Sequence, residues 1–373
     1  MSAKITRCTL EVFQPVPKTR WVLLTVETAD GFEGLGEATL QRAEDKVFVA
    51  AALQLPLLIG TMADPAVVSR MPRPDLPTAT VLSALSQALW DIAARRDGVS
   101  VAAALGQLLT PSVPLYANIN RRTVERSPEH FAESARLALA AGFEAVKLAP
   151  FDEVITPDGS EVRLLGLGLE RVAAVREAIG PIRDLMVDCH WRFSPAGARA
   201  ALAALGPMGL HWFECPLPET DEMIPELCRL RRLANNAGML LAGCETEIGL
   251  AGFERFAGAG AYDVVMPDIK HIGSVDEMLA LARRLEGSGV AFAPHNPSGP
   301  VSHAASLHLC AAAPAMSRLE MQFDETPLFW SLVGGALPKP VVGASGLPQG
   351  PGLGVKLDAA ILASRCQRRA IFT

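Results

Sequence analysis

The chain has 373 residues, of which 50% are hydrophobic and 20% are charged. This length and composition predict a large buried core and exclude a single small domain. The formal net charge of −6, without a run of like charges, is not typical of a nucleic-acid-binding protein, so we expect no nucleic-acid partner.

The N-terminus carries no apolar segment behind its first charged residues, which argues against a signal peptide. The longest mostly apolar stretch, Val47 to Gly60, is too short to span a bilayer and is interrupted by Gln54 and Pro56. The seven cysteines form no C-x-x-C pair, so neither a zinc ribbon nor a disulfide framework is indicated. We therefore expect a cytoplasmic protein without a membrane segment.

Residues 1–112 are predicted to form an α+β domain without obvious chemistry of its own. The turn Ala29-Asp30-Gly31 lies between two strand patterns and is typical of a hairpin. Behind this hairpin, apolar residues recur at helical spacing. We expect strands at residues 5–13, 21–28 and 33–38, and helices at residues 42–53, 80–96 and 101–109.

The segment Pro111-Ser112-Val113-Pro114 marks a boundary, after which apolar runs alternate with helical patterns and each run ends in a polar residue. These end residues are Lys147, Asp188, Glu214, Glu245, Asp268, His295 and Glu320. The step from Lys147 to Asp188 is longer than the others. From Asp188 onward the end residues recur roughly every 25 to 30 residues, which is the length of a parallel βα unit. The pattern predicts a TIM-type (β/α) barrel over residues 113–325, whose strand ends gather these side chains at one mouth.

Other elements of the barrel follow in chain order. We expect strands at residues 115–118, 142–147 and 263–268, and helices at residues 128–141, 250–257, 275–286 and 301–312. The segment 151–159 is predicted to be a loop at the catalytic end, where insertions shape substrate specificity. The tail, residues 326–373, is rich in Gly and Pro and is predicted to pack back onto the N-terminal domain.

The segment Val187-Asp188-Cys189-His190 is the most informative strand end. In an extended strand Asp188 and His190 point to the same face, because successive side chains alternate. A carboxylate beside an imidazole indicates a metal ligand next to a proton-transfer group. Asp188, Glu214 and Glu245 each follow an apolar run at adjoining strand ends, which favours one shared site over three surface carboxylates.

Taken together, these residues resemble the enolase superfamily, specifically its mandelate racemase-like branch and, within it, the acid-sugar dehydratases. The resemblance extends over nearly the whole chain, from Ala88-Leu89-Trp90-Asp91-Ile92-Ala93 to Gly350-Pro351-Gly352-Leu353-Gly354. It implies a modified (β/α)7β barrel with an α+β capping domain that the C-terminal tail completes. The Asp-x-His form at residues 188–190 is similar to that of galactonate, gluconate or mannonate dehydratases, in which the histidine acts as the acid.

The resemblance implies one Mg²⁺ ion held by Asp188, Glu214 and Glu245 at the ends of the third, fourth and fifth strands. Hard carboxylate oxygens suit this ion. Its charge would stabilise the oxyanion that forms when a proton next to a carboxylate is removed.

The same resemblance implies a dyad in which His295 takes the α-proton and Asp268 orients the imidazole ring. His190 would protonate the departing β-hydroxyl. Lys147 would contact the substrate carboxylate or help to neutralise the intermediate, and Glu320 matches the acid of the eighth strand and would hydrogen-bond to the intermediate.

Many relatives carry Lys-x-Lys on the second strand, whereas Lys147-Leu148-Ala149 keeps only the first lysine, which disfavours a two-base racemase of the Lys/His kind. The expected reaction is dehydration of an acid sugar to a 2-keto-3-deoxy acid. The alternatives are racemisation or epimerisation of a 2-hydroxy or amino acid with the same dyad, and a non-catalytic barrel that binds metabolites. We expect a small-molecule acid as the partner and, as for relatives of this architecture, a homo-oligomer.

Several polar residues near the expected mouth have alternative roles. Lys270 and His271 follow Asp268 and could reach the mouth, and Glu247 is close enough to Glu245 to be an alternative ligand. Two further histidines are expected to be solvated or packed on a helix, and three cysteines are expected to be buried thiols between strands and helices. These five residues are His303, His308, Cys189, Cys215 and Cys244.

Overall fold

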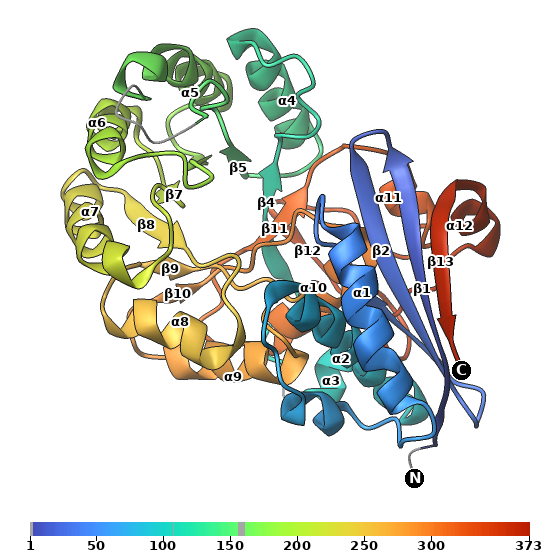
Figure 1. Cartoon of the computed structure of the whole chain (residues 1–373). Helices are drawn as coiled ribbons and strands as arrows, with labels where there is room; N and C mark the ends of the chain where they lie inside the picture. The colour runs from blue at the N-terminus through green and yellow to red at the C-terminus, as the bar shows by residue number, and fades with distance from the viewer. Residues whose placement is uncertain (1–2, 107, 156–160) are drawn as a thin grey trace.

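Two β-sheets organise the chain, whose computed structural model describes residues 3–106, 108–155 and 161–373. The first is an antiparallel sheet in the order β13-β1-β2-β3. The second is a parallel sheet that curls into a barrel and is ringed by helices (Figure 1). None of the helices in the described part of the chain combines the length and hydrophobicity that crossing a membrane requires.

The N-terminal sheet contains the three predicted strands and a fourth from the other end of the chain. Its strands are β1 (Ile5–Val16), β2 (Thr19–Thr28), β3 (Glu33–Glu37) and β13 (Cys366–Phe372). β13 pairs with β1, so the tail does return to the N-terminal domain. The tail was not predicted to form a strand, because Gln367, Arg368 and Arg369 face solvent and show no apolar alternation.

The helices of this domain are α1 (Glu44–Gln54), α2 (Leu76–Arg96) and α3 (Val101–Ala104), with short 3₁₀ turns η1 (Leu55–Leu58) and η2 (Pro65–Arg70). Asp75 caps the N-terminus of α2, and its side chain accepts a hydrogen bond from Thr78 N. The backbone of α2 lies against β3, because a Cβ atom at Gly36 would be only 1.9 Å from Ala84 O. α3 ends earlier than predicted, shortly before Gly106, whose φ of 128° favours glycine.

The barrel strands run, in sheet order, as β10 (Ala291–Phe292), β9 (Val264–Val265), β8 (Leu240–Gly243), β7 (Trp212–Glu214), β6 (Asp184–Asp188), β5 (Ala145–Leu148), β4 (Val113–Asn118) and β11 (Leu319–Gln322). A helix follows each strand from β4 to β10. These helices are α4 (Pro128–Ala140), α5 (Leu165–Ile179), α6 (Pro195–Leu205), α7 (Ile224–Asn236), α8 (Gly249–Gly258), α9 (Val275–Leu285) and α10 (Pro300–Ala312). Three more short 3₁₀ turns are η3 (Glu161–Leu164), η4 (Gly206–Met208) and η5 (Asp221–Met223).

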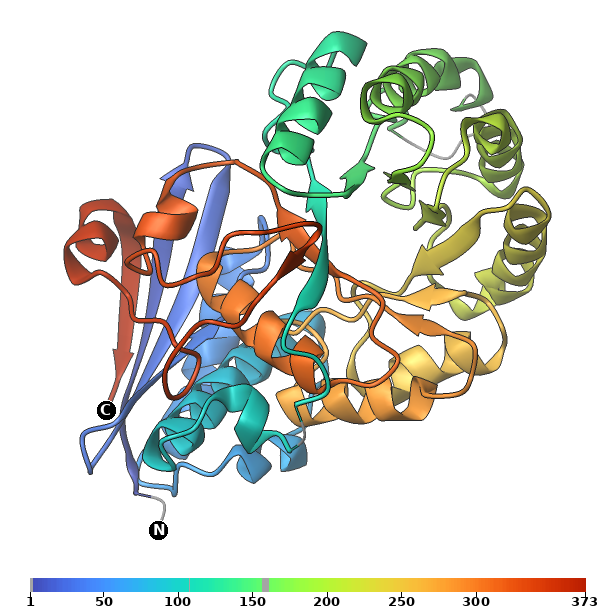
Figure 2. The same cartoon turned by 180° about the vertical axis from the view of Figure 1, so that it is seen from behind.

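Hydrogen bonds between the two ends of this sheet close the barrel. Ser317 N donates to Phe292 O at 2.9 Å, and Glu320 N donates to Pro294 O at 3.2 Å. After β11 the chain forms only the short α11 (Leu328–Ser331) in place of a covering helix, and then β12 (Ala344–Ser345) and α12 (Ala359–Arg365) on its way to β13 (Figure 2). The expected (β/α)7β barrel with its capping domain is therefore confirmed, while the boundaries at residues 112 and 325 stay predictions.

β9 and β10 are much shorter than the apolar runs that end at Asp268 and His295 predict. β9 covers two residues of the expected strand 263–268, and β10 is equally short. Pro267 and Pro294 follow these strands, and proline has no N–H group to continue a ladder. Of the predicted loop 151–159, the described part up to Ile155 contains neither helix nor strand, and residues 156–160 lie outside the described residues.

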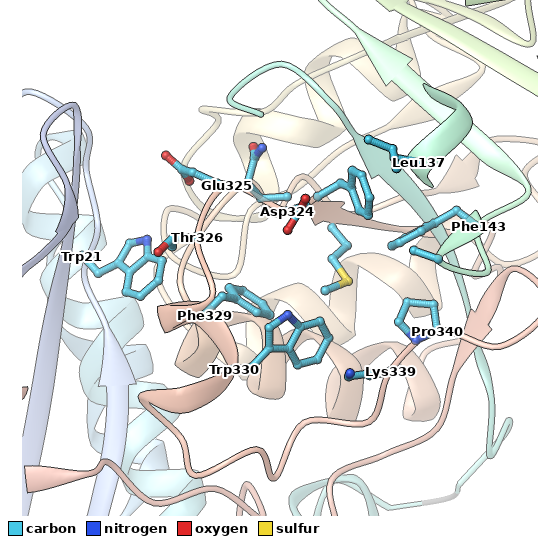
Figure 3. A pocket seen from close by; sticks show the side chains of 14 residues that line it. Trp21, Leu137, Phe143, Asp324, Glu325, Thr326, Phe329, Trp330, Lys339 and Pro340 are labelled. Carbon is cyan, nitrogen blue, oxygen red and sulfur yellow. The ribbon is translucent and has the colours of Figure 1, made fainter. Parts of the chain in front are cut away.

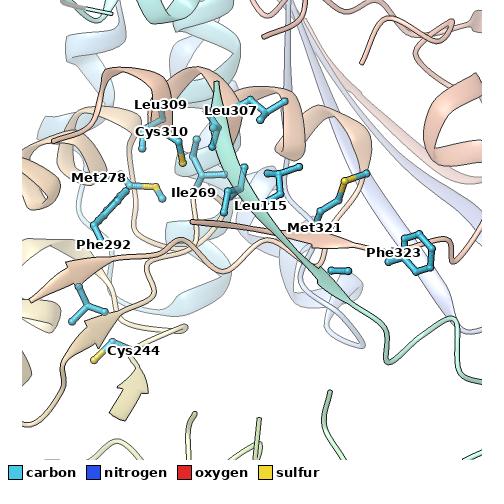
Figure 4. Close-up of a cluster of buried hydrophobic side chains, with 14 of the residues drawn as sticks. Leu115, Cys244, Ile269, Met278, Phe292, Leu307, Leu309, Cys310, Met321 and Phe323 are labelled. Atoms are coloured by element: carbon cyan, nitrogen blue, oxygen red, sulfur yellow. The ribbon is translucent and has the colours of Figure 1, made fainter. Parts of the chain in front are cut away.

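Large side chains fill the barrel and form its floor. Tyr116 on β4 and Trp212 on β7 pack edge to face with ring centroids 5.3 Å apart, although their strands are not neighbours. The residues that pack with them are Met186, Ala242, Val264, Met266, Ala145 and Ala293. Outward-facing side chains form the main core with the helices, and Figure 4 shows part of it around Leu115, Leu307 and Met321. The cysteines at positions 189, 215 and 244 are buried and free, as expected.

Candidate active site

The C-terminal end of the barrel carries a cluster of three buried carboxylates, which we call the acid cluster: Asp188, Glu214 and Glu245. One oxygen atom of each lies within 4.8 Å of the others. Asp188 ends β6, Glu214 ends β7, and Glu245 follows β8 by two residues. Adjacent parallel strands end at the same rim, so their last side chains meet there.

The donor set of the acid cluster fits a divalent cation. Glu245 Oε1 is buried and has no hydrogen-bond partner among the described residues. Burial raises the pKa of Glu245 well above its usual value, and the charge of Asp188 raises it further. Three close carboxylates are compensated best by a hard cation with oxygen ligands, and Mg²⁺ is such a cation. We expect these three residues to hold it.

Lys147 on β5 lies beneath the acid cluster and is fully buried. Its Nζ atom is 2.5 Å from Glu214 Oε1, 3.0 Å from Glu320 Oε1 and 3.9 Å from Asp188 Oδ2. Burial lowers the pKa of Lys147, but the charges of Glu214 and Glu320 outweigh burial and hold it well above its usual value. The ammonium group is therefore a fixed positive charge among the acids.

Glu320 on β11 is held in place from two sides. Asn118 Nδ2 donates to its Oε1 atom at 2.7 Å, and Asn296 N donates to its Oε2 atom at 2.9 Å. Burial alone would raise the pKa of Glu320, but the ammonium of Lys147 lowers it below the usual value. Glu320 thus lies next to the acid cluster as an ionised group with few open acceptor positions.

His295 and Asp268 form a hydrogen-bonded pair beside the acid cluster. His295 Nδ1 is 2.8 Å from Asp268 Oδ2, and His295 Nε2 is 3.5 Å from Glu245 Oε2. Asp268 also accepts a hydrogen bond from Lys270 N at 2.7 Å and forms an ion pair with the Lys270 ammonium. Burial raises the pKa of Asp268, but Lys270 and then His271 reverse this and lower it far below its usual value. The Nε2 atom of His295 is thereby directed at the cluster.

His190 lies at the opposite side of the mouth. Its Nε2 atom is 2.9 Å from Asp188 Oδ2, and its side chain is 43% exposed. β6 and β10 are four strands apart in a closed barrel of eight, so His190 and His295 approach the acid cluster from opposite sides. The charge of Asp188 raises the pKa of His190 above its usual value.

The expected strand geometry of the Asp188–His190 pair is wrong, although the two side chains do meet. β6 ends at Asp188, and the next residues leave the extended conformation. His190 and Trp191 have φ values of 48° and 55°, in the left-handed region. The imidazole therefore meets Asp188 through a tight turn, not through alternation along a strand.

The alternative ligand Glu247 is not part of the acid cluster, because it forms an ion pair with Arg255 at 3.0 Å. His271 faces the N-terminal domain, where its Nδ1 atom is 3.1 Å from Thr80 Oγ1. Burial lowers the pKa of His271 to about 4. The two histidines of α10 are buried and packed, not solvated: His303 and His308.

Three contacting residues were not predicted: Asn118, Trp212 and Asn296. Trp212 Nε1 donates to Glu214 Oε2 at 2.7 Å. Its position two residues before Glu214 places both side chains on the same face of β7, and this spacing could have identified it. The spacing of the two asparagines offers no comparable signal, because each reaches Glu320 from a different strand end.

A cavity of about 390 Å³ lies away from these residues. It is lined by Phe143, Met321, Phe329 and Trp330 among others, between α4, β11 and α11 (Figure 3). None of the acid cluster, His190 or His295 borders it, so the largely apolar cavity is separate from the candidate site.

Comparison with known proteins gives matches in both halves of the chain. Residues 6–106 match the family described as mandelate racemase / muconate lactonizing enzyme, N-terminal domain, and residues 130–361 match the family described as enolase C-terminal domain-like. The chain is 30% identical over 316 residues to a D-galactonate dehydratase of Xanthomonas euvesicatoria. The matched region covers 82% of this chain and 78% of that protein.

A D-gluconate dehydratase of Thermoproteus tenax is 31% identical over 285 residues, or 76% of this chain, and the match spans 56% of that longer relative. Among solved structures, a mandelate racemase/muconate lactonizing enzyme from Jannaschia sp. CCS1 superposes with a TM-score of 0.85 at 27% identity, with 98% of each chain covered. A putative dehydratase from Salmonella enterica, at 23% identity and a TM-score of 0.87, shares the fold.

Proposed function

Because the chain belongs to the mandelate racemase and muconate lactonizing enzyme family of the enolase superfamily, we propose that it is a Mg²⁺-dependent hydro-lyase. Its substrate is an acid sugar, and its product is a 2-keto-3-deoxy acid. The observation that carries this proposal is the acid cluster with one histidine on each side, His295 and His190. Dehydratases among the similar proteins support the same reaction class.

The first step is removal of the proton next to the substrate carboxylate. His295 takes this proton at Nε2, while Asp268 holds the Nδ1–H group and stabilises the imidazolium that forms. The fixed ammonium of Lys147 reduces the negative charge around the developing enediolate. A Mg²⁺ ion held by the acid cluster would supply further positive charge to that oxyanion.

The second step is loss of the β-hydroxyl. His190 donates a proton to the departing oxygen as the C–O bond breaks, and water leaves from the side of the mouth opposite His295. The resulting enol tautomerises to the 2-keto acid. Because Lys147 is fully buried and bonded to two acids, we assign it to charge compensation instead of a direct contact with the substrate carboxylate.

A second candidate is racemisation or epimerisation, which the opposed placement of His190 and His295 also supports. In that reaction His190 would return a proton to the α-carbon from the opposite face. Product analysis separates the two reactions, because dehydration yields a keto acid and epimerisation does not.

The direct test is a screen of purified protein with Mg²⁺ against aldonic and aldaric acids, with semicarbazide detection of 2-keto acids. We expect a keto-acid signal that disappears with EDTA and in His190→Asn. If no acid gives a signal, deuterium incorporation from D₂O is measured with the same compounds. Incorporation with inversion at the α-carbon and without a keto acid would establish epimerisation, and the absence of both incorporation and keto acid across the library would contradict the proposal.

The proposed enzyme is cytoplasmic and acts as a homo-oligomer on a small-molecule acid. Light scattering of the purified protein measures its mass in solution. A mass equal to that of one chain would contradict the proposed assembly without affecting the proposed reaction.

A further inference from the structure

A buried carboxyl group outside the proposed reaction lies beside one of the turns that form the mouth. Glu219 follows β7, and its Oε2 atom is inaccessible to solvent. Its Oε1 atom accepts hydrogen bonds from Cys244 N at 2.5 Å and from Tyr262 Oη at 2.8 Å. Among the described residues, no hydrogen bond or ion pair joins Glu219 to the acid cluster or to the Asp268–His295 dyad, so its role is separate from theirs.

Glu219 holds the turn that carries a proposed metal ligand. Cys244 has a φ of 74°, and this left-handed turn redirects the chain from β8 so that Glu245 faces Asp188 and Glu214. A buried N–H in such a turn needs an acceptor, and the carboxyl group of Glu219 supplies it. The close approach requires a glycine, because a Cβ atom at Gly243 would lie 2.5 Å from Glu219 Oε1.

We propose that Glu219 is a positioning residue that fixes the turn at Cys244 and thereby holds Glu245 in place as a metal ligand. The inference rests on the proposed function, because it assumes that Glu245 binds the metal. It adds a residue that touches neither substrate nor metal.

The surroundings of Glu219 explain why its geometry is well defined. Its ionisable neighbours are Tyr262, the thiols of Cys215 and Cys244, and Glu247, whose charge is paired with Arg255. Burial raises the pKa of Glu219 to about 7, and the donated hydrogen bonds limit this increase. Directional hydrogen bonds thus hold the carboxyl group, which forms no ion pair with the described residues.

The test measures Mn²⁺ binding to the metal-free protein by the loss of the free-ion EPR signal, without substrate. Glu219→Ala is expected to bind Mn²⁺ about 10- to 100-fold more weakly than the wild type, the usual effect of losing a residue that supports a ligand. Glu219→Gln keeps an acceptor oxygen for Cys244 N and is expected to recover most of this affinity. Glu222→Gln, an exposed carboxylate on the same segment, is the matched control and is expected to bind as the wild type does.

A second measurement separates positioning from loss of fold. The thermal midpoints of the variants in EDTA are expected to stay close to that of the wild type. If Glu219→Ala does not fold, Tyr262→Phe is used, and it is expected to weaken Mn²⁺ binding in the same direction by a smaller factor.

A folded Glu219→Ala with wild-type Mn²⁺ affinity would overturn the inference and leave the proposed dehydration intact. Conversely, a wild type that binds Mn²⁺ but acts on no acid sugar would contradict the proposed dehydration alone, because the support of Glu245 is measured without substrate. A wild type that binds no Mn²⁺ would contradict both.

Discussion

Trp212 supports one residue of the acid cluster from the floor of the barrel. It is fully buried, packs edge to face on Tyr116 and donates from Nε1 to Glu214 Oε2 at 2.7 Å. Glu214 has its other oxygen on Lys147, so both oxygens are oriented before any metal binds. This arrangement resembles the outer hydrogen bonds that orient ligands in metal sites generally.

We expect Trp212→Phe to weaken Mn²⁺ binding by about 10- to 100-fold, because phenylalanine fills the floor but cannot donate to Glu214. Calorimetric titration of the metal-free protein measures this. Trp330→Phe, in the separate cavity of Figure 3, is the matched control. Equal affinities of both variants would show that Lys147 alone is enough to orient Glu214.

We expect His295→Asn to lose α-proton exchange by at least about 100-fold, because an amide cannot take the proton that the imidazole accepts. Deuterium incorporation from D₂O is followed by NMR with a substrate from the screen. Mn²⁺ binding should persist, since the acid cluster is unchanged. His211→Asn, before β7 at the other end of the barrel, serves as the control. Continued exchange in His295→Asn would show that another group is the base.

At the scale of single residues, the sequence indicates the acids and histidines but not how they are held. Asp188, Glu214 and Glu245 could be found because each ends an apolar run. The left-handed turns at His190, Trp191 and Cys244 could not, because none of these residues is a glycine that would mark a positive φ. Alternation along a strand predicts that His190 lies beside Asp188. The two side chains do meet, but a left-handed turn brings them together instead of strand alternation.

At the scale of elements, one face of α2 carries hydrogen-bonding side chains, mostly buried, that contact the loop after β9 and the start of α9. Thr80, Ser83, Gln87 and Trp90 recur at helical spacing along one face. They contact, in turn, the His271 ring, Gly273 N, Ile269 O and Asp276. The same loop contains Asp268, so the N-terminal domain contacts the segment that carries the Asp268–His295 pair. From the sequence, such a face would be assigned to solvent, because the barrel that covers it comes from residues about 190 positions away.

The buried neutral His271 predicts a pH-dependent stability of this contact. Burial lowers its pKa to about 4 from the ordinary 6.5, so below pH 6.5 the unfolded chain binds a proton that the folded protein excludes. The contribution of the neutral His271 to the free energy of unfolding is fully present above pH 6.5 and is lost as the pH falls toward 4. The expected loss at pH 5 is about 2 kcal/mol.

Urea unfolding at pH 7.5 and pH 5 measures this effect in the wild type and in His271→Asn. The variant removes the titrating ring, so its free energy of unfolding is expected to fall less between the two pH values. The buried histidines of α10 contribute equally to both proteins and cancel in the comparison. The same decrease in both proteins would show that His271 does not control this part of the acid sensitivity.

At the scale of the whole molecule, the C-terminal tail is attached to the N-terminal domain at Asp91. Asp91 on α2 accepts hydrogen bonds from Leu35 N at 3.0 Å, Leu353 N at 2.8 Å and Arg95 Nε at 2.8 Å. Gly352 has a φ of 73°, and a Cβ atom there would lie 2.0 Å from Asp91 Oδ1. The two sequence segments that pointed to the family, at residues 88–93 and 350–354, therefore meet at one buried carboxylate.

We expect Asp91→Ala to lower the free energy of unfolding by about 3–5 kcal/mol, the usual effect of removing one partner of a buried ion pair. The loss leaves Leu35 N and Leu353 N without an acceptor and Arg95 without its counter-charge, so the tail should also detach more easily. Urea unfolding measures the first effect, and trypsin cleavage near Lys356 and Arg365 measures the second. Asp97→Ala, exposed at the end of the same helix, is the control. If both variants unfold at the same urea concentration, Asp91 does not hold the tail, and the pairing of β13 with β1 must carry the connection alone.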